Sequence, residues 1–65
     1  MRILLKQIMD AKGLNYDQVE ALTGVSRSTI LDIANEKESP YIDDLEKLAA
    51  GLGVKMQDIA ESDFW

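Results

Sequence analysis

Apolar residues recur at helical spacing along most of the chain. Near the start they stand at positions i, i+1, i+4 and i+5, namely Leu4, Leu5, Ile8 and Met9. Polar residues separate them, so one stripe of a helix would be apolar and the rest polar. Gly13 follows Lys12, as is typical of a helix C-terminus. The pattern predicts a first helix over about 2–12.

The stretch from Asn15 to Asn35 reads as two short helices joined by a tight turn at Gly24. Asn15 and Gln18 have the spacing of a capping box, which predicts a helix over about 16–23. Ser26 is a suitable N-cap for a second helix ending near Asn35. Ile30 and Ile33 form the inner edge of that helix, and Val25 stands where it would plug the turn.

The rest of the chain also predicts helices. Ser39-Pro40 is a start signal, with Ser as N-cap and Pro as the first helical residue, for a helix over about 41–51 that Gly51 and Gly53 would break. Val54, Met56 and Ile59 indicate a last short helix over about 55–61. No alternation at period 2 competes with these patterns. We therefore expect an all-α, five-helix domain spanning 1–65, with 62–65 as a disordered or dimer-forming tail.

Composition narrows the possible chemistry. The chain has no Cys and no His, which excludes disulfides, thiolate sites, the common zinc and nonhaem iron sites, and Ser/His or Cys/His catalysis. Asp43 and Asp44 are adjacent and so do not face one site on a helix; they suit the first helical turn instead. We expect no enzyme, cofactor or metal. No apolar run is long enough to span a membrane, so a soluble, cytoplasmic domain is expected.

Residues Gly13 to Ile59 resemble the lambda-repressor/Cro-like helix-turn-helix family, often called XRE. The matching pieces are Gly13-Leu14, the run Gly24-Val25-Ser26-Arg27-Ser28-Thr29-Ile30, Asn35, Lys37, Pro40, Leu45, Leu48-Ala49 and Leu52-Gly53-Val54. The resemblance implies a compact lambda-repressor-like domain. It also implies a DNA-binding transcriptional regulator whose recognition helix, about 26–34, enters the major groove of double-stranded DNA.

By the same resemblance, the DNA-contacting residues are Tyr16, Arg27, Ser28, Thr29, Asp32, Asn35 and Lys37. Arg27 and Ser28 are the best candidates for base contacts, since a guanidinium can fork onto guanine O6 and N7; the alternative is a surface Arg that only solvates its helix. Thr29, Asn35 and Lys37 would bind backbone phosphates. Asp32 could accept from cytosine N4, although an acid in a groove more often repels. The Tyr16 hydroxyl either reaches a phosphate or its ring only covers apolar surface.

Several positions depart from the family pattern. Met9 and Ala34 replace an Arg–Glu pair, and because both charges are missing together, none is left buried without a partner. Glu20 stands where the family prefers a small residue, and we expect it to turn outward into solvent. Glu36 replaces a Gly, at a cost in backbone strain if a positive φ is needed there.

The charge of the chain does not favour DNA binding as clearly as the sequence pattern favours the helix-turn-helix fold. The net charge is −5, and in residues 16–38 Arg27 and Lys37 oppose five acids. So few cations would release few counterions, which favours a dimer that doubles the contacts. The candidate residues for a homodimer contact are Met56, Ile59, Phe64 and Trp65. The two terminal aromatics could instead fold back on the monomer. The alternative function is an acidic helix-turn-helix that binds a protein partner and has lost or weakened DNA binding.

Overall fold

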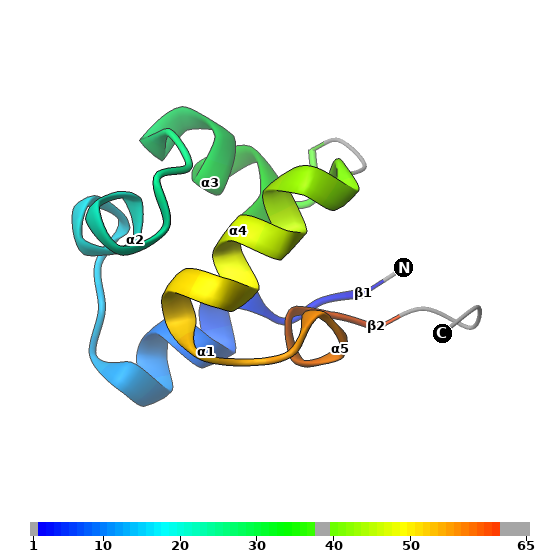
Figure 1. The fold of residues 1–65 in the computed structure, drawn as a ribbon, viewed down its shortest axis with the longest axis horizontal. Helices are drawn as coiled ribbons and strands as arrows, with labels where there is room; N and C mark the ends of the chain where they lie inside the picture. The colour runs from blue at the N-terminus through cyan, green and yellow to red at the C-terminus, as the bar shows by residue number, and fades with distance from the viewer. Residues whose placement is uncertain (1, 38–39, 62–65) are drawn as a thin grey trace.

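The structure, a computed structural model, describes residues 2–37 and 40–61. Within them the chain forms five helices and two short strands (Figure 1). In chain order these are β1 (Arg2–Ile3), α1 (Leu5–Lys12), α2 (Tyr16–Thr23), α3 (Arg27–Ala34), α4 (Ile42–Leu52), α5 (Met56–Ile59) and β2 (Ala60–Glu61). The all-α class is confirmed, and the strand pair is a small addition that the sequence did not predict.

One cluster of apolar side chains holds these elements together. Its largest fully buried members come from α1, α2, α3, α4 and α5: Leu5, Val19, Ile30, Leu45, Leu48 and Ile59. Every buried side chain in the described part of the chain is apolar. Met9 and Ala34 are both in this core, at 5% and 7% exposure, so the two positions where the family has a charged pair are apolar and buried here.

The two strands join the start of the described chain to its end. They pair antiparallel, Arg2 opposite Glu61 and Ile3 opposite Ala60, and the Leu4 amide donates to the Ile59 carbonyl at 2.6 Å. This pairing corrects two predicted boundaries, because α1 begins at Leu5 and not at residue 2, and α5 ends at Ile59 and not at 61. The strands lie at one end of the molecule, and α2 and α3 lie toward the other (Figure 1).

Helix α4 is the support on which the helix-turn-helix rests, since α2 packs against both α4 and α3. The prediction that Gly51 breaks α4 is wrong, because Gly51 lies inside the helix. The helix ends at Gly53, whose φ is +70°. Nor is Pro40 the first helical residue. It precedes the N-cap, which is Tyr41, while Ser39 lies outside the described residues.

The end of α2 comes so close to Gly51 that a Cβ there would lie 2.6 Å from the Leu22 carbonyl oxygen. A glycine is therefore required inside α4, because only a residue without a Cβ allows the backbones of α2 and α4 to come this close.

Candidate nucleic-acid interface

The turn between α2 and α3 fixes how α3 is presented. Gly24 takes the left-handed conformation at φ +77° and its N–H donates to the Glu20 carbonyl at 2.9 Å. The Thr23 hydroxyl donates to the Val19 carbonyl and accepts from the Val25 N–H at 3.2 Å. The Val25 side chain is buried at 4% exposure, which confirms that it plugs the turn. Local hydrogen bonds and one apolar anchor thus set the angle at which α3 leaves α2.

Helix α3 has a buried edge and an outward face. Ile30 and Ile33 are in the core, as predicted. Arg27, Ser28 and Asn35 are exposed, and the positions between these two sides, Thr29, Leu31 and Asp32, are half-buried. The predicted DNA-contacting residues of α3 therefore lie on or beside its exposed surface.

Hydroxyl groups cluster at the N-terminus of α3. The Ser26 Oγ accepts from the Thr29 N–H at 3.4 Å and donates to the Thr29 Oγ1 at 2.8 Å, and it lies 3.4 Å from the Ser28 Oγ. Ser26 is the N-cap, as predicted. Thr29 keeps its own hydroxyl hydrogen for another acceptor.

Two carboxylates of α2 hold Arg27, the first residue of α3. The Glu20 Oε2 accepts from the Arg27 backbone N–H at 2.7 Å. The Asp17 Oδ1 lies 3.1 Å from the Arg27 Nε in an ion pair. Glu20 is exposed, as expected, but it is also a second cap for α3, a role that the sequence interpretation missed. The available signal was the i, i+3 spacing of two acids facing a helix N-terminus.

The C-terminal end of α3 is held by two side chains. The Asn35 Nδ2 donates to the Leu31 carbonyl at 2.9 Å. Glu36 has φ +56°. The backbone at this position, where the family usually has Gly, therefore does adopt a positive φ. The Glu36 Oε1 accepts from the Ile3 N–H of β1 at 3.1 Å, which ties the loop after α3 to the strand pair. Lys37 follows, exposed, with its N–H donating to the Asp32 carbonyl.

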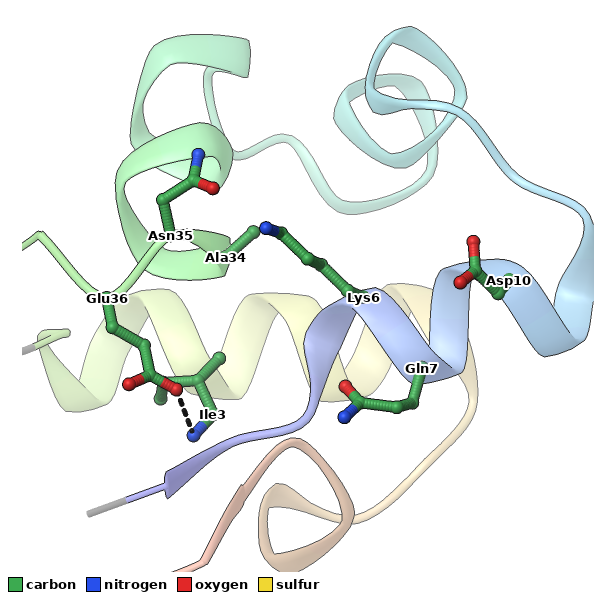
Figure 2. A pocket seen from close by; sticks show the side chains of 7 residues that line it. All are labelled: Ile3, Lys6, Gln7, Asp10, Ala34, Asn35 and Glu36. Carbon is green, nitrogen blue, oxygen red and sulfur yellow. Dashed lines mark hydrogen bonds between the residues drawn. The ribbon is translucent and has the colours of Figure 1, made fainter.

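A hollow of about 510 Å³ separates this end of α3 from α1. Its lining comes from both sides: Ile3, Lys6, Gln7, Asp10, Ala34, Asn35 and Glu36. Figure 2 shows the Lys6 side chain extending from α1 toward α3. The structure thus places a third cation beside Asn35, although the sequence analysis did not name Lys6 as a DNA-contacting residue. Nothing in the sequence pattern marks this long-range approach.

Tyr16 is the first residue of α2 and is not part of α3. It is half-buried and packs against the apolar core at the start of α2. It lines a smaller hollow of about 260 Å³ with Lys6, Met9, Asp10, Leu14 and Asn15. Its ring therefore covers apolar surface, which was one of the two predicted roles; its contact with a phosphate stays a prediction.

Comparison with protein families decides the identity of this arrangement. A model of the Cro/C1-type HTH DNA-binding domain matches residues 4–64, nearly the whole chain. The chain belongs to this family. The Cro/C1-type family consists of DNA-binding regulators and not of enzymes, so the protein is a DNA-binding regulator. A search of curated proteins gave no match.

The remaining predicted contacts fall outside the helix-turn-helix of this Cro/C1-type domain. Among the residues proposed for a dimer contact, Ile59 is fully buried and Met56 is half-buried against the core. Phe64 and Trp65 lie outside the described residues. In the part of the chain that the structure describes, no three acidic, His or Cys side chains are grouped to hold a metal ion, and no helix is long and apolar enough to cross a membrane.

Proposed function

We propose that this DNA-binding regulator is of the Cro/repressor type and reads a specific duplex sequence with residues 26–34 in the major groove. The observation that carries the proposal is the outward face of α3. Arg27 and Ser28 are exposed at its N-terminal end, while Ile30 and Ile33 fix the opposite edge in the core. A helix held in this way can enter a groove about 12 Å wide without unfolding its support.

The polar groups on and beside this face have separate roles in the proposal. Arg27 reads guanine O6 and N7, and Ser28 contacts the neighbouring base edge. Thr29 and Lys37 bind phosphates. Asn35 also binds a phosphate, through the Nδ2 hydrogen that its bond to Leu31 leaves free.

Three further residues complete the proposed interface. Asp32 accepts from cytosine N4 at the edge of the contact. Tyr16 and Lys6 contribute phosphate contacts from α2 and α1, where Lys6 extends toward α3 (Figure 2).

Selection from a randomised duplex pool tests this function. The wild-type chain is expected to enrich one sequence motif containing an Arg27-dependent guanine. Arg27→Ala should reduce the preference for that guanine about 5- to 100-fold, the range for one bidentate base contact. Arg2→Ala is the matched control, because Arg2 is also an exposed arginine with an acidic partner, but lies on β1. Equal loss in both variants, or no enriched motif at low salt, would refute sequence-specific reading.

We also propose that the regulator binds DNA as a homodimer. Within residues 16–37 the cations are Arg27 and Lys37, against Asp17, Glu20, Asp32 and Glu36. Two copies on a twofold site double the phosphate contacts that so few cations can make. Sedimentation of the chain on an enriched duplex should give two protein chains per duplex, with half-sites about one helical turn apart. A 1:1 complex of full affinity would overturn the dimer, and a chain that binds no duplex would favour a protein partner instead.

A further inference from the structure

We propose that Asp17 is a positioning residue for base reading: it holds the Arg27 side chain so that its terminal nitrogens are presented to a guanine. The inference deepens the proposed function and rests on it. It also assigns a role in DNA binding to Asp17, whose negative charge alone would oppose that binding. The geometry around the first residue of α3 supports this role.

Arg27 is held at two separate points. Asp17 and Glu20 are three residues apart on α2 and so lie on the same face of that helix. Glu20 accepts from the backbone N–H of Arg27 at 2.7 Å, which fixes where the side chain starts. Asp17 contacts the side-chain Nε at 3.1 Å, which fixes where the guanidinium lies.

The ion pair leaves the base-reading edge of the guanidinium open. Nε provides one of the five N–H donors of Arg, and the other four lie on the two terminal nitrogens. The ion pair is made at Nε, which lies 3.1 Å from the Asp17 Oδ1. The two terminal nitrogens can therefore still fork onto guanine O6 and N7 while Asp17 is bound. A carboxylate that masked Arg27 would instead occupy these terminal nitrogens.

The pair is too exposed for its main role to be stability. The two side chains are 55% and 78% exposed, and ion pairs in such surroundings contribute little to folding. What the pair does is restrict a long, flexible side chain before DNA arrives. Because the side chain is already ordered, it loses less conformational entropy when DNA binds, and the restriction therefore favours the bound state.

Base preference at the Arg27-dependent position tests the inference. The full chain and two variants, Asp17→Asn and Glu46→Gln, are measured against duplexes that differ only by guanine or adenine there. Asp17→Asn is expected to reduce the guanine preference about two- to tenfold, the effect of one freed side chain. Its affinity for the adenine duplex should stay equal or rise, because a negative charge is gone.

Glu46→Gln is the matched control. It removes the same charge from an exposed position of α4, outside the helix-turn-helix. It should therefore keep the wild-type guanine preference. A general effect of charge or of folding would change both variants alike, which would overturn the inference.

A measurement without DNA completes the test. In the free wild-type chain, ¹⁵N relaxation of the Arg27 Nε should show an ordered side chain, and Asp17→Asn should make it mobile on the picosecond-to-nanosecond timescale. Equal mobility in both chains overturns the inference, as does an unchanged or stronger guanine preference in Asp17→Asn. A wild-type chain that selects no sequence overturns the proposed function, and this inference with it.

Discussion

At the scale of single residues, Gly51 sets how closely the helix-turn-helix can approach α4. A Cβ at this position would lie 2.6 Å from the Leu22 carbonyl oxygen and 2.7 Å from the Thr23 Cα. Both are backbone atoms, so they cannot move aside as the end of a side chain can. The contact requires a glycine although glycine weakens a helix interior.

Gly51→Ala is therefore expected to destabilise the fold by about 1–3 kcal/mol, the usual cost of overpacking, as measured by urea denaturation. Helix propensity alone predicts the opposite sign, a gain of about 1 kcal/mol. Ala50→Gly, at the exposed neighbouring position, is the control and should lose about that amount. A stabilised Gly51→Ala variant would show that α2 and α4 are not in close contact.

Glu36 combines an unfavourable backbone with a useful side chain. Its φ of +56° is strained for a residue with a Cβ, while its carboxylate accepts the Ile3 N–H at 3.1 Å. Glu36→Ala keeps the strain and loses the acceptor, so we expect a loss of about 1–2 kcal/mol in unfolding free energy. Glu36→Gly also loses the acceptor but relieves the strain, and it should be more stable than the Ala variant by roughly 1 kcal/mol. Thermal melts of equal midpoint for the two variants would argue against backbone strain.

At the scale of elements, α3 depends on its neighbour α2 for part of its N-terminal capping. Ser26 bonds the Thr29 N–H at a long 3.4 Å, whereas Glu20 bonds the Arg27 N–H at 2.7 Å. The stronger cap is thus supplied from the preceding helix. The start of α3 and its angle to α2 are therefore fixed by the same hydrogen bond.

Glu20→Ala is expected to lower stability by about 1 kcal/mol, as for the loss of an N-cap, with a matching fall in the thermal midpoint. Glu46→Ala on α4 removes another exposed glutamate from a helix and should change stability by less than about 0.5 kcal/mol. If the two variants melt together, the bond from Glu20 to Arg27 does not stabilise α3.

Elements whose signals are local could be predicted from the sequence. The bounds of α2 were right because its capping box and Gly24 mark both ends, and both halves of that capping box are present in the structure. The ends of α1 and α5 were wrong because Arg2–Ile3 and Ala60–Glu61 pair with each other across the whole chain. Strands of two residues carry no readable alternation, and a partner so distant leaves no local signal.

At the scale of the whole molecule, repulsion between like charges is the main unbalanced electrostatic force. The net charge is −5, and within residues 2–37 and 40–61 the ion pairs are Arg2–Glu61 at 4.0 Å and Arg27–Asp17 at 3.1 Å. Screening should therefore remove more repulsion than attraction.

The thermal midpoint of the free protein is thus expected to rise by roughly a few degrees between about 10 mM and about 200 mM NaCl. DNA affinity should fall over the same range, because bound counterions are no longer released as favourably. Differential scanning calorimetry and fluorescence anisotropy measure the two trends. A midpoint that falls with salt would mean that attractive pairs dominate the fold.

The candidate interface could be predicted only in part. The outward placement of Arg27 and Ser28 followed from helical spacing and the turn at Gly24. Other contacts depend on how α1, α2 and α3 cross in space. These are the placement of Lys6 beside Asn35 and the contacts of Asp17 and Glu20 with Arg27. The angles at which helices cross arise from the packing of the whole core. The apolar pattern of a single helix does not specify them.

The pairing of β1 with β2 means that the backbone nearly closes into a ring, with Arg2 opposite Glu61. A short peptide joining these residues would complete that ring, and new ends could be opened at the exposed Gly13 between α1 and α2. In such a circularly permuted chain the helix-turn-helix would be synthesised first and α1 last, yet every packing neighbour would stay the same. We expect the permuted chain to fold, because α3 packs against α2 and α1 whatever their order along the chain.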